Sequence, residues 1–351
     1  MKILIVSLEC VGSLGWYIKR ALLKMGYQAE LFDYRKIAYG HINFLQKHVC
    51  GRIAFKIFRN EAIKKMNIKL VNFAKSFSPD LIIVQKGEII FPETIRRIKK
   101  ILKAKIVVWH GDSPFSALTS SHNIIYSLSE YDVCFVFDPY YIPEMIRAGC
   151  KCAEYLPFAC DPSVHKEVEL TKEEKVIYGR DICFIGNYQG LQSKRTKILQ
   201  SLSDFDLKIW GNGWKNLRDP NLSKYIVGRP AYGEEMVKIY NACKISININ
   251  HEQSITGVNM RTFEAPACGC FLLTDELHEL SSFYNINKEI VCYKNISDLR
   301  KKMKYYLKNS QRREEIVKNG QEKVRKNHTY IHRMEKLIKV TYNKMDDSHG
   351  Y

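Results

Sequence analysis

The sequence predicts an α/β fold with two Rossmann-like domains in series, each built on a parallel sheet. Short apolar runs rich in β-branched residues alternate with longer segments of helical periodicity, a pattern typical of a parallel sheet covered on both faces. The alternation stops once near the middle of the chain and then starts again. A chain of 351 residues with 46% apolar content also suits two hydrophobic cores better than one.

The first half carries the alternation most regularly. We expect strands at residues 2–7, 28–32, 81–85, 106–109, 133–137 and 152–155. Helical periodicity lies between them, at residues 14–24, 54–77, 93–102, 123–128 and 141–148. Strands joined by helices in this way should run parallel in one sheet.

A proline-rich break separates the halves. Pro157 and Pro162 bracket it, and a charged stretch without strand character follows at residues 166–175. Beyond it, strands are expected at 182–185, 207–210, 225–227, 245–249, 271–274 and 290–293, with helices at 194–202, 233–243, 258–268, 296–307, 311–326 and 330–344. The predicted domains are residues 1–165 and 166–329, followed by a last helix and a short flexible tail at 330–351.

The composition indicates a cytoplasmic protein with anionic partners. The formal net charge of +18 favours nucleotide phosphates, acidic lipids or nucleic acid, although a solvated lysine-rich surface would give the same value. No module that reads nucleic acid is recognisable, so no nucleic-acid partner is expected. The eleven cysteines lack zinc spacing and no secretory leader is recognisable, so we expect reduced thiols.

Two basic helical segments, at residues 52–69 and 96–105, are candidates for peripheral contact with the inner face of an anionic membrane. The alternative for both segments is a solvated helix face. No apolar stretch approaches the roughly 18 residues needed to span a bilayer.

The most informative segment runs from Gly257 to Gly269. A turn opens a predicted helix, the helix ends at a glycine, and a strand follows at once. Backbone N–H groups in such a turn suit a diphosphate, and Arg261 adds a forked cation. Glu264 lies too deep in the helix to meet phosphate, but it can accept hydrogen bonds from a ribose diol. The alternative is a plain surface ion pair, because Arg261 and Glu264 stand three residues apart.

Three further predicted strands end in glycine at the same edge of the sheet. Glycine at such turns lets a ligand approach the backbone closely, and a basic pair opens the helix after the first of these strands. Four glycine turns with Arg or Lys nearby predict a nucleotide site, with these candidates: Gly186, Asn187, Lys194, Arg195, Gly211, Gly228, Arg229, Thr256, Gly257, Val258, Asn259, Arg261 and Glu264.

In the first half, three loops follow strands at the corresponding edge. Gly12 and Ser13 follow the first strand, without the spacing of the dinucleotide fingerprint. Lys86 follows the third strand, and His110 and Asp112 follow the fourth. His110 can act on a hydroxyl nucleophile or hold a hydroxyl group, and Asp112 can orient it or can be a turn residue before Ser113-Pro114.

No metal site is expected. Asp204 and Asp206 form an acidic pair, but they precede a predicted strand instead of following one, and the histidines are scattered.

The segment from Asn259 to Gly269 resembles the CgeB-like glycosyltransferases, relatives of retaining glycosyltransferase family four. Other matching residues follow in the order of that family: Phe184-Ile185-Gly186 with Arg195, Val227-Gly228, Tyr240-Asn241-Ala242-Cys243-Lys244, His328-Thr329-Tyr330 and Arg333. The resemblance implies the GT-B architecture, in which two Rossmann-like domains face a central cleft and the last helix returns to the first domain. Family four carries two Glu separated by seven residues; the second corresponds to Glu264, and Thr256 stands at the first position.

The resemblance also implies a function. The second domain would bind a nucleoside-diphosphate sugar of UDP or GDP type as co-substrate, with no cofactor and no metal. Glu264 would hold the ribose, the turn at 257–259 the diphosphate, Lys194 or Arg195 the leaving group, and the backbone at Gly228 the base. A hydroxyl acceptor on a glycan, a lipid-linked glycan or a protein would enter beside Gly12, Ser13, Lys86, His110 and Asp112.

Two mechanisms and two other functions stay open. If transfer retains the anomeric configuration, as the resemblance implies, His110 only positions a substrate; if it inverts, His110 or Asp112 is the candidate base. A sugar-nucleotide epimerase of the same fold would need no acceptor. A non-catalytic nucleotide- or glycan-binding protein would bind without turnover.

Overall fold

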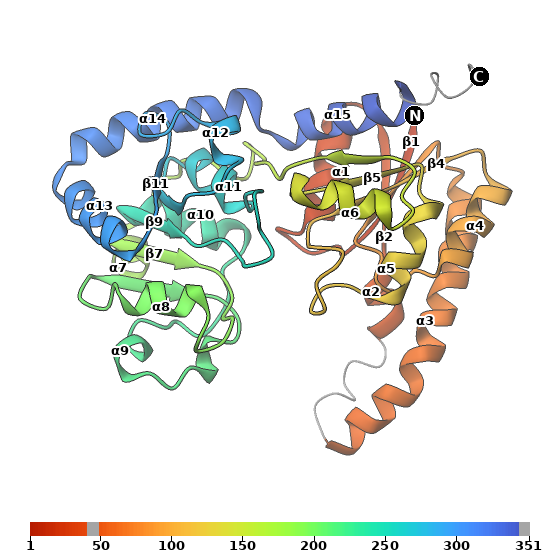
Figure 1. The fold of residues 1–351 in the computed structure, drawn as a ribbon, viewed down its shortest axis with the longest axis horizontal. Coiled ribbons are helices and arrows are strands. Elements are labelled where there is room, and N and C mark those ends of the chain that lie inside the picture. The colour runs from red at the N-terminus through yellow and green to blue at the C-terminus, as the bar shows by residue number, and fades with distance from the viewer. Residues whose placement is uncertain (41–48, 344–351) are drawn as a thin grey trace. The chain divides into compact units, whose positions relative to one another are not determined.

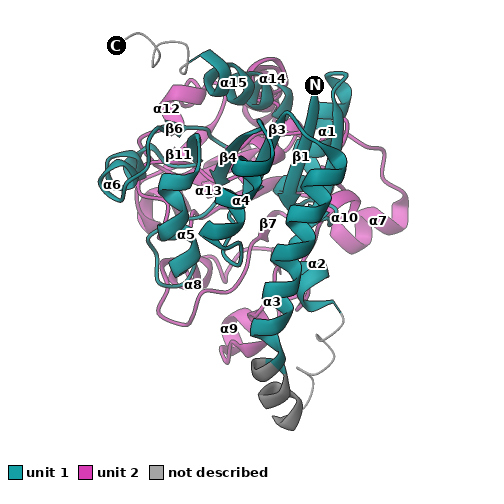
Figure 2. Cartoon of the chain, turned by 90° about the vertical axis from the view of Figure 1, so that its right-hand side faces the viewer, with its two compact units in different colours: residues 1–157, 330–351 teal, residues 158–329 magenta. Residues whose placement is uncertain are grey.

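The structure, a computed structural model, describes residues 1–40 and 49–343; the side chains of residues 49–54, 56 and 57 are outside the description. The chain forms two compact units, unit 1 with residues 1–157 and 330–351 and unit 2 with residues 158–329 (Figures 1 and 2). The chain thus enters unit 2 between Pro157 and Phe158, rather than after residue 165, and leaves it between Thr329 and Tyr330. The tail expected at residues 346–351 lies outside the described residues.

Unit 1 is built on a sheet of six parallel strands in the order β2-β1-β3-β4-β5-β6. Its strands are β1 Lys2–Ser7, β2 Gln28–Asp33, β3 Leu81–Gln85, β4 Lys105–His110, β5 Val133–Val136 and β6 Ala153–Tyr155. Its helices are α1 Leu14–Lys24, α2 Tyr34–Tyr39, α3 Val49–Phe77, α4 Pro92–Ile101, α5 His122–Ser127, α6 Ile142–Arg147 and α15 Tyr330–Asn343. The central strands are buried almost end to end, which requires helices on both faces of the sheet.

Helix α1 begins at Leu14, the residue that the sequence predicts. The Ser13 hydroxyl caps the helix by accepting a hydrogen bond from the Trp16 backbone N–H at 3.2 Å. Gly15, in the first turn, lies directly against β1, where a Cβ atom would stand 2.1 Å from the Ser7 hydroxyl oxygen. The absence of a side chain at residue 15 therefore lets α1 pack closely on the sheet.

The last helix, α15, packs within unit 1. Tyr330 stacks on Tyr17 of α1 with ring centroids 4.9 Å apart. The Arg333 Nε–H donates to the Pro157 carbonyl at 3.0 Å, and Lys336 Nζ donates to the Tyr155 carbonyl at 2.8 Å. The C-terminal helix therefore packs on α1 and on the end of β6.

Unit 2 contains a second parallel sheet, in the order β11-β10-β9-β7-β8. Its strands are β7 Ile182–Ile185, β8 Leu207–Trp210, β9 Ile245–Asn248, β10 Leu272–Asp275 and β11 Val291–Tyr293. Its helices are α7 Lys172–Tyr178, α8 Lys194–Gln200, α9 Pro220–Ser223, α10 Gly233–Ala242, α11 Arg261–Ala267, α12 Leu280–Phe283, α13 Ile296–Lys308 and α14 Ser310–Asn327. Phe184, Ile247 and Leu273 of the strands form one core with Trp214 and with Met303 of α13.

The strand expected at residues 225–227 is reduced to a single parallel bridge between Ile226 and Ile209 of β8. Gly228, at φ 78°, turns the chain away, and a proline follows at residue 230. The segment still runs alongside the end of β8, because the Gly211 N–H donates to the Arg229 carbonyl at 3.0 Å.

Two other expectations need correction. Helix α11 begins at Arg261 and not at residue 258, because the Asn259 side chain accepts from the Arg261 N–H at 2.9 Å and ends the turn there. The charged stretch at residues 166–175 has no strand, as expected, but from Lys172 on it belongs to α7, a helix that was not expected and that a capping box of Thr171 and Glu174 opens.

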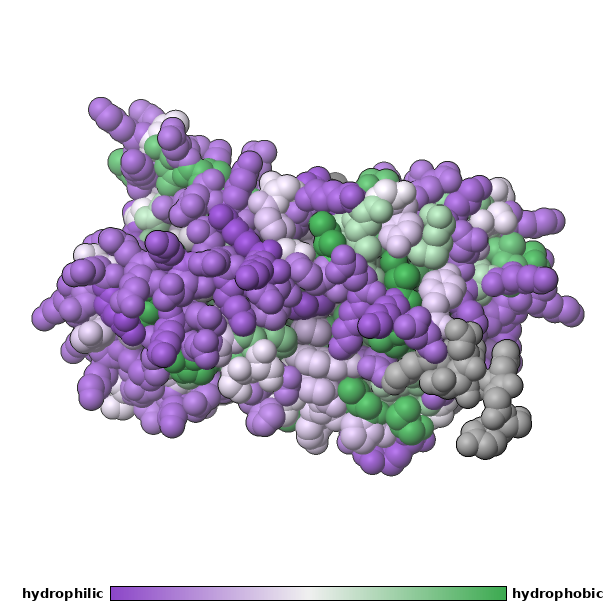
Figure 3. All heavy atoms as spheres, turned by 90° about the horizontal axis from the view of Figure 1, so that it is seen from above, coloured by the Kyte–Doolittle hydropathy of each residue, from purple (hydrophilic) through white to green (hydrophobic). Residues whose placement is uncertain are grey.

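The face drawn in Figure 3 is mainly hydrophilic. Each of the cysteines whose side chain the structure describes is a free thiol. Among the helices of residues 1–40 and 49–343, none is both long and apolar enough to cross a bilayer.

Candidate active site

In unit 2, the ligand crevice of an open parallel sheet is expected between β7 and β9. The chain runs from β7 to β8 on one side, whereas β9, β10 and β11 lie on the other, so the strand order reverses at this point. Ligands of such folds bind outside the carboxyl ends of the strands at the reversal. The loops that leave β7 and β9, at residues 186–193 and 249–260, therefore border the candidate site.

Arg195 links the two loops that border this reversal point. Its guanidinium donates to the Asn187 carbonyl at 2.6 Å and to the Ile249 carbonyl at 2.8 Å, which joins the ends of β7 and β9. The side chain is buried and stacks over the Phe184 ring, and burial lowers the pKa of Arg195 to about 10, against the opposing charge of Asp275. Arg195 therefore holds the loops after β7 and β9 together beside the candidate site.

Lys194 is the basic side chain that stays accessible. Its Nζ lies 2.8 Å from Asp275 Oδ2 at the end of β10, and about half of the side chain is exposed. Of the two neighbouring basic residues, Lys194 is thus the one that a soluble anion can reach.

A chain of hydrogen-bonded side-chain amides, two of them buried, fixes the turn before α11. Asn250 donates through its side chain to Asp275 Oδ1 at 2.7 Å, and its own Oδ1 accepts from the Asn259 N–H at 3.0 Å. The Asn259 side chain then donates to Asn248 Oδ1 at 2.9 Å. Asn248, Asn250 and Asp275 were missed by the sequence reasoning, although each stands at or just beyond the carboxyl end of a predicted strand.

The turn at residues 256–260 is largely buried and has backbone N–H groups that could bind a ligand. Gly257 and Val258 are buried, and Thr256 is held through its carbonyl by the Glu279 N–H at 3.1 Å. Within the described part of the chain, the backbone N–H groups of Gly257, Val258 and Met260 donate to no recorded acceptor.

Arg261 and Glu264 do form the ion pair that their spacing allows, but the pair is not on the surface. Arg261 NH1 bonds Glu264 Oε2, and the Glu264 side chain is 1% exposed. The other oxygen, Glu264 Oε1, has no hydrogen-bond partner among the described residues. A buried carboxylate oxygen without a partner costs about 1–3 kcal/mol, so this atom calls for a functional explanation.

A Cβ atom on each of the three glycines at this edge would meet a neighbouring group, which is backbone for Gly211 and a side chain for Gly186 and Gly228. A Cβ atom on Gly211 would stand 2.0 Å from the Gly186 carbonyl oxygen, and Gly211 has φ 154°. The Gly186 carbonyl also accepts from Trp214 Nε1 at 2.7 Å. Gly228 lies against the Lys215 side chain, and Arg229 pairs with Glu235 on α10. Gly186 and Gly211 therefore let the ends of β7 and β8 approach each other closely.

In unit 1 the strand order reverses between β1 and β3. The loop after β3 reaches the loop after β4, since Lys86 Nζ lies 3.0 Å from Asp112 Oδ2. Lys86 has φ 67°, an uncommon conformation for a residue with a side chain, and Gly12 has φ 82° in the loop after β1. Ser13 lies in the same loop, where its hydroxyl caps α1.

His110, at the end of β4, is buried and neutral. Burial lowers its pKa to about 4, with Asp112 opposing the shift and Lys86 adding to it. Its Nε2 has no hydrogen-bond partner among the described residues. The Lys86–Asp112 pair and His110 therefore gather at one edge of unit 1, as expected from their places after β3 and β4.

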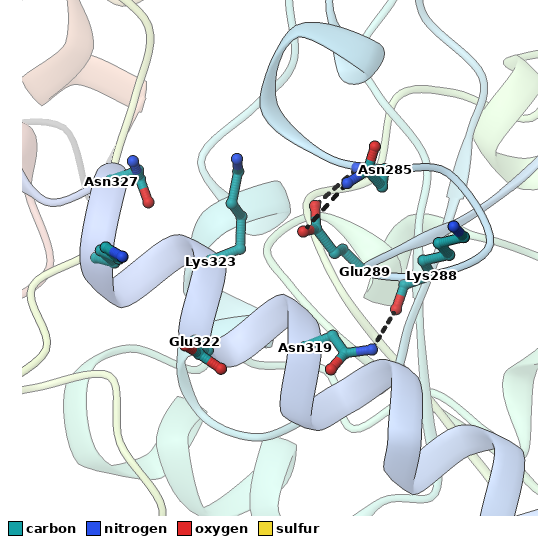
Figure 4. Close-up of a pocket in the computed structure, with 8 residues that line it drawn as sticks. Asn285, Lys288, Glu289, Asn319, Glu322, Lys323 and Asn327 are labelled. Carbon is teal, nitrogen blue, oxygen red and sulfur yellow. Dashed lines mark hydrogen bonds between the residues drawn. The ribbon is translucent and has the colours of Figure 1, made fainter.

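The described part of unit 2 has several hollows, two of which are described by their lining residues. One, of about 670 Å³, lies beyond β10 and β11 and is lined by Lys194, Lys197, Asp275 and Lys294, so it adjoins the candidate site. The other, of about 450 Å³, lies between α14 and the loop before β11 (Figure 4). In it Asn285 bonds Glu289, and Asn319 donates to the Lys288 carbonyl at 3.2 Å. This second hollow is at the amino end of the strands, away from the reversal point.

No group of three or more His, Cys, Asp or Glu side chains in residues 1–40 and 49–343 has an arrangement that could hold a metal ion.

Comparison with known proteins identifies the fold. Residues 194–339 match a family model described as glycosyl transferase-like. HepE of Anabaena, solved in complex with UDP-glucose, superimposes with a TM-score of 0.65 at 11% identity, over 97% of this chain and 99% of HepE. Sucrose-phosphate synthase of Thermosynechococcus elongatus gives 0.65 at 11%, over 99% and 100%, and a glycosyltransferase of Rickettsia africae gives 0.65 at 11%, over 97% and 98%. No curated protein sequence matches the chain significantly.

The two parallel-sheet units in series are those of the GT-B glycosyltransferase fold, as the sequence predicts. The family match covers most of unit 2 and α15. The specific likeness to CgeB-like enzymes stays a prediction.

Proposed function

We propose that this protein is a glycosyltransferase that moves a sugar from a nucleoside-diphosphate sugar to a hydroxyl acceptor on a glycan, a lipid-linked glycan or a protein. The observation that carries the proposal is Glu264, a buried carboxylate of α11 whose Oε1 has no hydrogen-bond partner among the described residues. A ribose diol would supply the missing donors. The glycosyl transferase-like match over residues 194–339 and the UDP-glucose in the HepE complex support a donor of this class, of UDP or GDP type.

The positive charge at the site would stabilise the leaving diphosphate. Lys194 is accessible, Arg261 is fixed by Glu264, and backbone N–H groups at Gly257 and Val258 point to no acceptor in the described chain. Fixed donors of this kind stabilise charge that develops on the leaving group without reorganising. Arg195 would not bind the diphosphate directly, because its guanidinium already donates to two backbone carbonyls. Its role would be to hold the loops of the site in place.

We propose that the acceptor binds unit 1 at the Lys86–Asp112 pair, beside His110. A His110 with a pKa of about 4 is a weak base at neutral pH, so it suits the positioning of a hydroxyl better than the abstraction of its proton. This favours the retaining mechanism, in which no strong protein base is needed.

Binding of nucleotides to the Glu264→Gln variant tests the proposal. The amide keeps the shape but loses the charge and one acceptor, so affinity for UDP or GDP should fall about tenfold or more in titration calorimetry. Glu315→Gln is the matched control, because Arg312–Glu315 has the same i,i+3 spacing on an exposed face of α14. If both variants bind like the unmodified chain, the ribose role of Glu264 is wrong.

A turnover assay with a panel of UDP- and GDP-sugars tests the mechanism. Transfer should persist in excess chelator and should conserve the anomeric configuration in the product, as read by NMR. Activity that disappears with chelator and returns with a divalent ion contradicts metal independence. Donor conversion without any acceptor would instead favour an epimerase.

We also propose peripheral contact with an anionic membrane through α3 and α4, where Lys64, Lys65, Lys69, Arg97 and Lys100 are exposed. Ile68 on α3 and Ile101 on α4 are about half exposed among them. Basic side chains interspersed with apolar ones suit an anionic lipid surface.

A further inference from the structure

We infer that Asp275 is a specificity-determining residue, whose carboxylate makes the site favour the sugar nucleotide over the nucleoside diphosphate that remains after transfer. The inference rests on the proposed function, in which Lys194 receives the leaving diphosphate. Asp275 does not touch the nucleotide in this account. It acts through the ammonium group of Lys194, to which it is paired, and through its own charge.

The Asp275 carboxylate lies at the carboxyl end of β10 between two neighbours. Asn250 donates to Oδ1 through its backbone N–H at 3.0 Å and through its side chain at 2.7 Å, and its backbone N–H also lies 3.3 Å from Oδ2. Lys194 Nζ lies 2.8 Å from Oδ2. The carboxylate therefore joins the basic side chain at the start of α8 to the loop after β9.

The two members of this ion pair differ in their freedom to move. The Asp275 side chain is 3% exposed and fixed by Asn250, whereas the Lys194 side chain is 49% exposed and has a flexible four-carbon stem. Both residues line the hollow of about 670 Å³ beside the candidate site. A ligand in that hollow can therefore reach the Lys194 ammonium group while Asp275 stays in place.

A phosphate that binds Lys194 must come close to Asp275. A phosphate oxygen lies about 2.8 Å from an ammonium nitrogen to which it is bonded, and Asp275 Oδ2 lies 2.8 Å from the same nitrogen. The phosphate oxygen and the carboxylate oxygen are then within about 6 Å of each other. Like charges at this separation repel, and salt screens a buried carboxylate only weakly. Asp275 thus reduces the net attraction between the site and a bound phosphate.

This repulsion differs between donor and product. In a sugar nucleotide the terminal phosphate is esterified and carries one negative charge. Transfer breaks the bond between the sugar carbon and the phosphate oxygen and leaves the electron pair on that oxygen, while the acceptor oxygen bonds the sugar carbon and loses its proton. The product gains nearly one further negative charge at neutral pH, because the second pKa of a phosphate is about 6. Asp275 therefore repels the product more strongly than the donor, which favours product release.

The competing explanation is structural: Asp275 would serve only to hold Asn250 and the turn before α11. Asp275→Asn separates the two roles, because the amide oxygen can still accept from Asn250 while the charge is removed. Asp132→Asn in unit 1 is the matched control. That carboxylate also pairs with a lysine at 2.8 Å, Lys99, and also accepts from a backbone N–H, that of Ile106 at 2.6 Å.

The experiment measures dissociation constants of the full chain by titration calorimetry, for UDP and UDP-glucose and for GDP and GDP-glucose. With Asp275→Asn, the nucleoside diphosphate should bind about tenfold more tightly and the sugar nucleotide about threefold more tightly. The ratio of the two constants is the readout, because a structural role would change both constants by the same factor. Asp132→Asn should leave both constants unchanged.

Lys194→Gln provides a second test that does not depend on the folding of Asp275→Asn, because the Lys194 side chain is half exposed. This variant leaves the carboxylate without its cation. It should weaken binding of the nucleoside diphosphate more than binding of the sugar nucleotide, so the ratio should move in the opposite direction.

The outcomes distinguish failure of the inference from failure of the proposed function. If the unmodified chain binds none of the four nucleotides, the proposed function fails. If it binds them and both Asp275→Asn and Lys194→Gln leave the ratio unchanged, the role of Asp275 is wrong. If Asp275→Asn weakens donor and product by the same factor, the structural explanation replaces ours. A ratio that shifts equally in Asp132→Asn would show an effect of net charge alone.

Discussion

At the candidate site, the guanidinium of Arg195 is already occupied by hydrogen bonds to backbone carbonyls. Both of its terminal nitrogens bond carbonyl oxygens, and the residue is 8% exposed. We expect Arg195→Met to lower the free energy of unfolding of unit 2 by about 3 kcal/mol, because the carbonyls of Asn187 and Ile249 lose a charged donor in a buried place.

Denaturation followed by fluorescence of Trp210 and Trp214 measures this loss. Lys194→Met is the control: it should leave the unfolding midpoint nearly unchanged and weaken nucleotide binding instead. A stable Arg195→Met protein that has lost only nucleotide affinity would contradict the bracing role.

The buried neutral His110 couples stability to pH. Its folded-state pKa of about 4 lies below the ordinary value of about 6.5, so the unfolded chain binds a proton in this window and the folded chain does not. The stability due to His110 is therefore present above pH 6.5 and is lost as pH falls toward 4, by up to about 3 kcal/mol.

Urea denaturation between pH 7 and pH 4 tests this. The free energy of unfolding of His110→Gln should depend less steeply on pH than that of the unmodified chain. Part of the remaining dependence should come from His165, whose pKa is also lowered. Equal slopes for the two proteins would mean that His110 does not titrate in this way.

At the level of elements, the contact between α1 and β1 depends on a missing side chain. A methyl group on Gly15 would stand 2.1 Å from the Ser7 oxygen and 2.3 Å from its Cβ. Gly15→Ala should therefore destabilise unit 1 by about 1–3 kcal/mol through overpacking.

The double variant Gly15→Ala, Ser7→Gly removes the atoms that clash and should recover part of the loss in thermal unfolding. An unaltered midpoint for Gly15→Ala alone would show that α1 can move away from the sheet without cost.

The same scale shows what the sequence could predict. Strands β1, β3, β7 and β8 have the bounds that their apolar runs predict, since buried parallel strands leave a continuous signal. The prediction of a strand at residues 225–227 was wrong, because this segment pairs with β8 through one bridge only and the chain turns away at Gly228. Helix α7 was missed although its capping box, Thr171 to Glu174, is readable in the sequence.

The candidate site was predictable only in part, because much of it is tertiary. Lys194, Arg261 and Glu264 stand out by local pattern. The role of Asn248 and Asp275, by contrast, depends on the pairing of β9 with β10, which the sequence alone does not reveal. His165 meets Glu264 across 99 positions of the chain, a pairing that no local spacing reveals.

For the whole molecule, the key feature is the return of α15 to unit 1. Tyr330 is 1% exposed, stacks on Tyr17 and lies 6.4 Å from the Trp109 ring. We expect Tyr330→Ala to destabilise unit 1 by about 3–5 kcal/mol, as for other buried aromatic truncations, and to leave unit 2 nearly unaffected.

Tyr305→Ala on α13 is the control, because that ring is about half exposed. Hydrogen exchange resolved by peptide should show faster exchange in α1 and β1 for Tyr330→Ala only. Equal acceleration in both units would contradict the assignment of α15 to unit 1.

The parallel bridge between Cys160 and Thr329 has a consequence for folding during synthesis, because it holds the two ends of unit 2 next to each other. Residues 158–329 begin and end side by side, so they form an insertion that can fold as soon as it has emerged. Unit 1, although it is synthesised first, has to wait with Tyr17 uncovered until residue 330 arrives. The earliest part of the chain is thus the last to be completed, and its apolar α1 surface is the segment most in need of protection during synthesis.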